Sequence, residues 1–312
     1  MPSVHTAVLL HEVVEVLTGA WRDASAPSSQ LQASSSSPWY LDGTLGGAGH
    51  ALAIVESLKG QVNLIGLDRD QQAIERAALT FKGSSGQIIL EREDFRNLDL
   101  VLDRHGIPAV DMILLDLGIS SDELDHSGRG FSFMRDEPLL MTMGDPAGYA
   151  FTARDIVNGW KEEDIANVIY AYGEEHFARR ISRAIVACRE KKPIETTIEL
   201  AEIVKSSVPG FYRRGKIHPA TKTFQALRIA VNDELAALRE GLAKGYARLA
   251  PGGRMAVISF HSLEDRIVKN FYKERASAGA TPITKKPIRP SSQEITENPR
   301  SRSAKLRIIL KS

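Results

Sequence analysis

The sequence contains very few cysteine and aromatic residues. Its 312 residues include one cysteine, Cys188, and 6% Phe, Trp and Tyr. A single cysteine cannot form an internal disulfide, and it excludes a zinc site built from several cysteines. No run of about 20 apolar residues is present, so we expect no transmembrane helix and no membrane partner. The N-terminus lacks a basic region followed by an apolar run, which argues against secretion. A cytoplasmic protein is therefore expected, with Cys188 buried in a helix.

Clustered metal ligands are also missing. The eight histidines are scattered, and no pair of them has the His-x3-His spacing or a cysteine partner. Because metal sites in proteins need several ligands at suitable spacing, the sequence predicts no metal site.

The charges nearly cancel over the whole chain but are unevenly distributed. Lys and Arg total 40 and Asp and Glu total 39, a net charge of +1. Residues 285–312 hold 8 basic and 2 acidic residues, which leaves 32 basic and 37 acidic residues elsewhere. A basic segment on an acidic body favours a polyanionic partner, although a solvated tail has the same composition. A second basic cluster, Arg213-Arg214-Gly215-Lys216, follows Pro209-Gly210 in a turn-like stretch that suits phosphate contacts or plain solvent.

Strand and helix patterns alternate in the first part of the chain. An amphipathic helix is expected at 8–19, followed by a serine-rich flexible loop at 24–38. The alternating order predicts an α/β fold with a parallel, right-handed, doubly wound sheet. The predicted strands are 39–41, 62–67, 87–90 and 110–115, and the predicted helices between them are 48–58, 71–81 and 98–104.

This alternation stops after residue 117. Loops are expected over 118–150, and only helical patterns follow, at 153–158, 162–171, 174–190 and 197–206. We therefore predict a catalytic domain of residues 1–124 and 217–312, interrupted by an inserted all-helical domain of residues 125–216. A long helix at 220–249, a strand at 254–259, a helix at 262–275 and a strand at 306–310 complete the catalytic domain.

A glycine-rich turn, from Asp42 to His50, connects the first strand to its helix. It matches neither the Gly-x-Gly-x-x-Gly pattern of dinucleotide enzymes nor a P-loop. An acidic residue at Asp42 repels a pyrophosphate but suits a cationic sulfonium and an amino group. The turn therefore favours S-adenosylmethionine over NAD.

Acidic residues end the first strands, namely Asp42, Asp68, Asp94 and Asp116. Because the carboxyl ends of parallel strands share one edge of a sheet, we expect these side chains to line a ligand site. Asp68 is placed to bind ribose hydroxyls, and Phe95 to cover an adenine. Each aspartate alone could equally be a helix cap.

The chain resembles the 16S ribosomal RNA cytosine-N4 methyltransferases, the MraW/RsmH family. Matching stretches lie in family order along nearly the whole chain: 5–10, 42–50, 66–70, 114–121, 129–133, 172–175, 218–229, 259–266 and 298–303. The resemblance implies a class I S-adenosylmethionine-dependent methyltransferase (Rossmann-like) fold with an inserted helical domain. It also implies methylation of the exocyclic N4 of a cytidine in the small-subunit decoding centre.

The resemblance assigns donor-binding residues and partners. The donor-binding set is Ala48, Gly49, His50, Asp68, Phe95, Asp116 and Glu123. The substrate would be 16S ribosomal RNA in the assembled small subunit, and a homodimer is left open. The family usually has glycine at 48, which we expect to be a neutral change, and glutamine at 123. It also usually has aspartate and arginine at the positions of Leu140 and Thr142, so this chain lacks the charged pair that the family has there.

The chemistry requires the weakly nucleophilic N4 to be held beside the donor methyl group, with an acceptor for its hydrogens. Asp116, Ser120 and Ser259 are candidate acceptors, and the catalytic group stays unassigned among Asp116, Ser259, Phe260 and His261. Phe260 would stack on the cytosine or pack in the core. His261 would bind the base or a phosphate, or be structural. Phe131 and Phe133 have the same two alternatives, core or base contact.

The sequence leaves open two alternative functions and the role of one basic surface. A noncatalytic ribosome-assembly factor would bind RNA without methyl transfer. A methyltransferase of another substrate, such as DNA, is disfavoured because Asp116 is followed by Leu117-Gly118 and not by a Pro-Pro turn. The inserted helices carry six basic residues, which either form one wall of an RNA cleft or belong to a solvated face. They are Arg179, Arg180, Arg183, Arg189, Lys191 and Lys192.

Overall fold

A computed structural model describes residues 7–19, 37–119, 124 and 127–312. The chain forms two compact units. The sheet unit comprises Met1–Gly118 and Leu235–Ser312, and the helical unit comprises Ile119–Glu234. The predicted serine-rich loop lies outside the described residues except for its last two positions, and so do Ser120 and Glu123.

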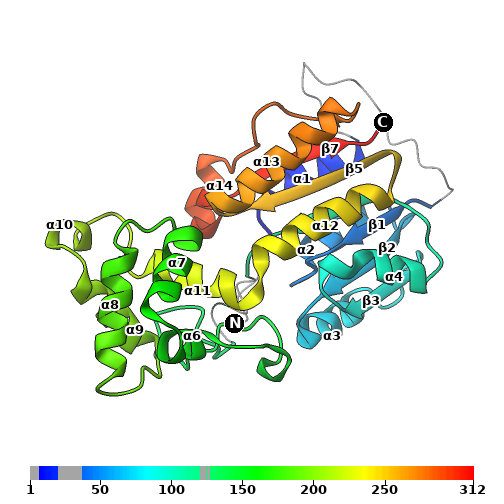
Figure 1. Ribbon diagram of the computed structural model, residues 1–312. Helices are drawn as coiled ribbons and strands as arrows, with labels where there is room; N and C mark the ends of the chain where they lie inside the picture. The colour runs from blue at the N-terminus through cyan, green and yellow to red at the C-terminus, as the bar shows by residue number, and fades with distance from the viewer. Residues whose placement is uncertain (1–6, 20–36, 120–123, 125–126) are drawn as a thin grey trace. The chain divides into compact units, whose positions relative to one another are not determined.

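Seven strands of the described chain form one sheet in the order β3-β2-β1-β4-β5-β7-β6 (Figure 1). The strands are β1 (Trp39–Asp42), β2 (Asn63–Asp68), β3 (Ile88–Arg92), β4 (Val110–Asp116), β5 (Leu249–Ser259), β6 (Thr281–Pro282) and β7 (Lys305–Leu310). β1 to β5 are parallel, which confirms the predicted doubly wound order. β7 is antiparallel to both of its neighbours, β5 and β6.

Helices cover both faces of this sheet, and alternate strand residues face each layer. Tyr40 and Met112 pack with α1 (Leu10–Thr18), α2 (Gly49–Ser57) and α3 (Gln71–Thr80). Leu41 and Ile113 pack with α4 (Leu98–Arg104), α12 (Glu234–Arg248) and α13 (Ser262–Ser277). Two-sided burial explains why the strands are nearly continuous apolar runs. The C-terminal basic segment is ordered as α14 (Ser292–Glu297), a 3-10 turn (Pro299–Ser303) and β7, so it is not a free tail.

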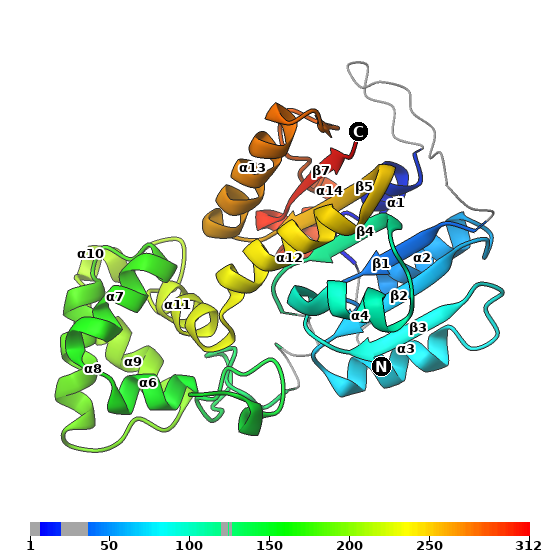
Figure 2. The same cartoon turned by 45° about the vertical axis from the view of Figure 1, so that its right-hand side comes forward.

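The helical unit has its own apolar core. Figure 2 shows its helices as one group of ribbons, in green to yellow. Its helices are α6 (Ala153–Gly159), α7 (Glu162–Gly173), α8 (Ala178–Arg189), α9 (Thr197–Ser207), α10 (Gly210–Arg213) and α11 (Thr221–Asn232). Capping boxes start α6, between Thr152 and Asp155, and α9, between Thr196 and Glu199. The first of these confirms the start predicted from the sequence.

The long helix predicted at 220–249 is wrong, because the structure has two helices there. Asp233 has a left-handed backbone, with φ of 50°, between α11 and α12. Arg228 binds Glu234 across this break with two hydrogen bonds of 2.8 Å each. The structure places α11 in the helical unit. It packs so closely against α7 that a Cβ added at Gly173 of α7 would lie 2.6 Å from the Lys222 carbonyl oxygen of α11. The helical unit therefore extends beyond the boundary expected at 216.

Among the helices of the described residues, none is both long and apolar enough to cross a membrane.

Candidate active site

Three aspartates lie together at the carboxyl edge of the sheet. Asp42 of β1 pairs with Gly66 of β2 and Leu114 of β4. Asp68 and Asp116 therefore each stand two residues beyond the level of Asp42, as expected from the sequence. Asp94 instead caps the turn after β3, accepting a hydrogen bond from the Arg96 amide at 3.0 Å. It also pairs with Arg69 at 3.1 Å, so its role is local.

Backbone hydrogen bonds hold the glycine-rich turn against both neighbouring strands. The Gly43 amide donates to the Leu114 carbonyl at 3.0 Å, and the Leu45 amide donates to the Leu67 carbonyl at 2.9 Å. A Cβ at Gly43 would lie 2.5 Å from Leu115 Cδ2, so a larger residue there would displace the Leu115 side chain. Ala48 is left-handed, with φ of 60°, which strains an alanine by about 1 kcal/mol. The alanine is therefore not neutral for the backbone, in contrast to our expectation.

Asp68 fixes the tip of this turn. Its Oδ2 accepts from the Gly46 amide at 2.7 Å, and its Oδ1 accepts from the Asp70 amide at 2.8 Å. Burial raises the pKa of Asp68, and these hydrogen bonds partly counteract that effect. Each carboxylate oxygen has a second lone pair, so the predicted contact to ribose hydroxyls is still available.

Asp42 is almost completely buried beneath the turn, with 1% of its surface exposed. The Tyr40 hydroxyl donates to Oδ2 at 2.9 Å, and the Thr44 amide donates to Oδ1 at 3.1 Å. Burial is the main cause that raises the pKa of Asp42 to about 6. At neutral pH the carboxyl is therefore mostly ionised and supplies a buried negative charge. The Tyr40–Asp42 pair has a sequence signal that we missed, since residues i and i+2 of a strand share one face.

Asp116 has one buried oxygen that makes no hydrogen bond within the described residues, Oδ1. Its other oxygen, Oδ2, lies 3.6 Å from His50 Nδ1. Burial raises the pKa of Asp116 well above the usual value, and the charges of Asp42 and Glu264 raise it further. A buried polar atom without a partner indicates a missing hydrogen-bond donor.

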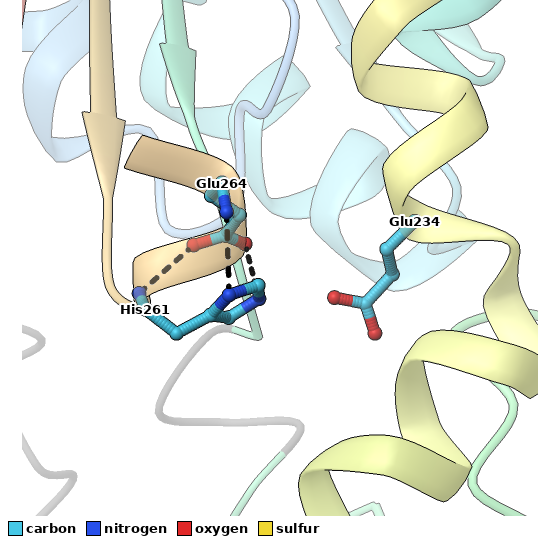
Figure 3. A group of neighbouring side chains, drawn as sticks. All are labelled: Glu234, His261 and Glu264. Atoms are coloured by element: carbon cyan, nitrogen blue, oxygen red, sulfur yellow. Dashed lines mark hydrogen bonds and ion pairs between the residues drawn. The ribbon is translucent and has the colours of Figure 1, made fainter. Parts of the chain in front are cut away.

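His261 and Glu264 form the start of α13 (Figure 3). Glu264 Oε2 accepts from the Phe260 amide at 2.8 Å and from the His261 amide at 3.1 Å. The Glu264 amide in turn approaches His261 Nδ1 at 3.4 Å. This reciprocal capping box agrees with the structural interpretation of His261. The His-x-x-Glu spacing could have revealed the cap, although histidine is unusual in that position.

The other candidates at the end of β5 are also engaged. The Ser259 hydroxyl is buried and faces the Lys305 carbonyl of β7 at 3.4 Å. Phe260 is half-buried and packs against the core cluster of α1 and α2. These contacts favour structural roles for both residues. Among the four candidates, Asp116 Oδ1 and His261 Nε2 are the buried side-chain atoms that make no hydrogen bond within the described residues, although His261 Nε2 lies 3.2 Å from Glu264 Oε1.

Phe95 packs closely against two glycines. A Cβ at Gly241 of α12 would lie 2.5 Å from Phe95 Cδ2, and a Cβ at Gly43 would lie 3.0 Å from Phe95 Cβ. The ring is half-buried, which leaves part of it available to a ligand. Its predicted contact with adenine stays a prediction.

The aromatic candidates of the helical unit belong to its core. Phe131 is buried, and Phe133 stacks on His218 with ring centroids 4.6 Å apart. Thr142, at the position of the missing charged pair, is fully buried, and its hydroxyl donates to the Gly144 carbonyl at 3.0 Å. A buried threonine of this kind cannot contact a substrate. Cys188 lies in α8 and is only half-buried.

The predicted cleft residues of the helical unit are partly engaged. Arg183 is 3.7 Å from Glu162, Arg189 donates to the Val157 carbonyl at 2.9 Å, and Lys192 binds Glu199 at 2.6 Å. The remaining members of the set are exposed, namely Arg179, Arg180 and Lys191.

Fold and site together define a class I S-adenosylmethionine-dependent methyltransferase. The sheet order with an antiparallel β7 beside β5 has the form of that class. Buried acids at Asp42 and Asp116 suit a cationic donor, and the buried, unpartnered Oδ1 of Asp116 has lone pairs left for a hydrogen-bond donor.

The chain belongs to the MraW methylase family, whose sequence model matches residues 2–312. It is 47% identical over 304 residues to ribosomal RNA small subunit methyltransferase H of Deinococcus deserti, covering 97% of this chain and 92% of the relative. It is 43% identical over 324 residues to the protein of the same name in Heliobacterium mobile, covering 98% of each chain. The Syntrophotalea carbinolica relative, also of that name, is 46% identical over 286 residues, covering 86% of this chain and 90% of the relative.

Proposed function

We propose that this protein transfers a methyl group from S-adenosylmethionine to the exocyclic N4 of a cytidine in small-subunit (16S) ribosomal RNA. We place the target in the decoding centre of the assembled subunit and the enzyme in the cytoplasm. Support for ribosomal RNA comes from the family and from the names of relatives at 43–47% identity. The resemblance of the motifs supports N4 and the decoding centre.

The unpartnered Oδ1 of Asp116 is the observation that carries the chemistry. The N4 lone pair of cytosine is delocalised into the ring, so the amino group must pyramidalise before it reacts. A carboxylate that accepts an amino hydrogen favours this change. In the transfer, N4 bonds to the methyl carbon while the carbon–sulfur bond breaks and its electron pair stays on sulfur. The N4 proton is then released to the acceptor.

The other edge residues would bind and orient the donor, which supplies an electrophilic methyl group. Asp68 would accept hydrogen bonds from ribose hydroxyls and Phe95 would contact the adenine. Asp42, with a pKa of about 6, would place negative charge near the cationic part of the donor. Ala48, the residue before α2, and Gly49 and His50, its first two residues, would contact the donor through their backbone.

The test uses purified protein, labelled S-adenosylmethionine and small subunits that lack the modification. After digestion, nucleosides are identified by mass, and naked DNA serves as the control substrate. We expect label only in N4-methylcytidine from the subunits. Label in another nucleoside, or in DNA, would contradict the proposed substrate. If the protein binds the donor but transfers no methyl group to assembled subunits, the assembled subunit is not its substrate. If it binds RNA but not the donor, a noncatalytic factor is favoured.

A further inference from the structure

A surface loop of the helical unit combines an exposed aromatic ring with unpaired cations. We call residues 209–217 the aromatic-basic loop. Phe211 is 69% exposed, which is unusual for so large an apolar side chain. Arg213, Arg214 and Lys216 are exposed, and none of them takes part in the ion pairs formed by the described residues.

The base of this loop is held firmly although its outer side chains are exposed. The Tyr212 and Arg213 amides donate to the Pro209 carbonyl at 3.0 and 3.1 Å. The Tyr212 hydroxyl binds the buried carboxylate of Glu175. The Phe177 ring packs edge-on against Tyr212, with centroids 5.0 Å apart. The chain therefore presents Phe211 on a pre-ordered support, which lowers the entropy lost on binding.

Charge identifies the kind of partner. Residues 203–232 contain six Lys and Arg residues and no Asp or Glu. Arg179 and Arg180 add two exposed cations at the start of α8, directly after Phe177, whose ring also contacts Phe211 with centroids 6.3 Å apart. Lys205 and Arg228 of this stretch pair with Glu202 and Glu234, so the uncompensated positive charge lies on the loop itself and at the start of α8. Such a cluster of cations favours a polyanion over a protein surface of mixed charge.

We propose that the aromatic-basic loop binds RNA, with Phe211 stacked on an unpaired base and Arg213, Arg214 and Lys216 against the flanking phosphates. This inference rests on the proposed function, which makes RNA the substrate. An exposed aromatic ring can stack only on a base that is not already stacked within a helix, so the partner is a single-stranded or looped segment. The loop thus adds affinity for the substrate outside the donor site.

Stacking is tested with Phe211→Ala against a matched control, Tyr170→Ala. Tyr170 lies on α7 of the same unit and is 64% exposed. We expect Phe211→Ala to weaken binding of small subunits and of a fluorescent unpaired RNA 20-mer by about 5- to 100-fold. Its KM for subunits should rise with little change in kcat, and S-adenosylmethionine affinity should be unchanged. Tyr170→Ala should behave as wild type. Equal effects of the two variants would overturn the proposal.

Rescue variants separate stacking from simple apolar contact. Phe211→Trp should bind RNA at least as well as wild type, and Phe211→Leu should resemble Phe211→Ala. If Phe211→Leu restores subunit binding, or if naked RNA binds all variants alike while subunit binding falls, the loop contacts a protein and the RNA assignment is wrong. Thermal denaturation of each variant reports whether the fold is retained.

The phosphate contacts are tested by salt dependence. Arg213→Gln/Arg214→Gln should lower the slope of log affinity against log salt by about 1.4. The control, Lys82→Gln/Lys273→Gln, removes the same charge from exposed positions of the sheet unit and should leave the slope unchanged. An unchanged slope for the arginine variant would overturn the phosphate contacts.

The outcomes also separate this inference from the proposed function. If wild type methylates subunits and the loop variants match it in RNA binding and KM, the function stands and the inference is wrong. If wild type fails to methylate but the loop variants lose RNA affinity, the inference stands and the function is wrong. If wild type binds neither RNA nor subunits, both are wrong.

Discussion

His50 lies between the Val8 carbonyl and Asp116. Its Nε2 is 2.9 Å from Val8 O, and its Nδ1 is 3.6 Å from Asp116 Oδ2. Because a carbonyl oxygen can only accept, Nε2 carries a hydrogen. A neutral His50 therefore turns the lone pair of Nδ1 toward Asp116. A proton on Asp116 would make this contact favourable. Burial, followed by the charges of Asp42 and Glu264, raises the pKa of Asp116 in that direction.

Replacing Asp116 by asparagine should lower the rate of methyl transfer about 100-fold. The variant loses the charged acceptor for the N4 hydrogens but keeps the side-chain shape, so the fold should be retained. Single-turnover transfer to small subunits, at saturating donor, measures the effect. The wild-type rate should rise with pH as Asp116 loses its proton, and this dependence should disappear in the variant. A variant rate within threefold of wild type would remove Asp116 from the chemistry.

Asp68→Ala should weaken S-adenosylmethionine binding by roughly 10- to 100-fold, because the loss of about 1.4–2.8 kcal/mol is typical of hydrogen bonds to a charged group. The matched control is Asp70→Ala. Asp70 caps α3 through the Gln72 amide at 3.1 Å and supports no predicted ligand contact. That variant should lose about 1 kcal/mol of stability and bind the donor normally. Titration calorimetry measures the donor affinity of the two variants, and urea denaturation measures their stability. Equal donor affinity for the two variants would refute the ribose assignment.

Asp42→Asn should change the pH dependence of folding stability. The pKa of Asp42 is about 6 in the folded chain and 3.8 as its ordinary value. The stability that its protonated form contributes is fully present below 3.8 and is lost as pH rises through 6. We therefore compare the unfolding free energy of the variant with that of wild type at each pH. This difference, variant minus wild type, should be about 2–3 kcal/mol larger at pH 8 than at pH 4. Urea denaturation without donor measures this, and a difference independent of pH would contradict the assignment.

Gly241→Ala should destabilise the sheet unit by about 1–3 kcal/mol, because its methyl group would overlap the Phe95 ring. Gly159→Ala is the control, since a Cβ there meets nothing within 4 Å. Combining Gly241→Ala with Phe95→Ala should relieve the overlap and give a favourable coupling in a double-mutant cycle. Donor affinity of Phe95→Ala alone then tests the adenine contact. Additive stability changes would show that the ring can move away.

The sequence predicts best the positions of the strands, which follow from local apolar runs, and the placement of the residues at the strand ends. Continuous apolar runs identify β2 and β4, and the aspartates that follow them lie together because parallel strands end at one edge. The break at Asp233 is not visible in this way, since the apolar periodicity of α11 continues into α12. The interruption depends on the Arg228–Glu234 ion pair and on Asn232, which binds the Met141 carbonyl at 2.7 Å.

Side-chain roles at the site are predicted less well than positions. The strand-end placement of His261 is correct, but its imidazole caps α13, because Glu264 three residues later closes the box. Likewise, Ser259 follows the sequence pattern of a site residue, yet its hydroxyl faces Lys305 on β7. That contact depends on the antiparallel pairing of β7, which no local pattern specifies.

The pairing of β4 with β5 has a consequence for how the molecule folds. Asp116 pairs with Ile258, so in the sequence the whole helical unit is inserted between two strands that are neighbours in the sheet. Closing so long a loop is slow when the chain between the strands is disordered. The helical unit is one continuous stretch with its own core, and it can fold before β5 is available. If this unit folds first, it replaces a long flexible tether by a compact body, and we expect β5 to find its place beside β4 faster than it would across a disordered loop.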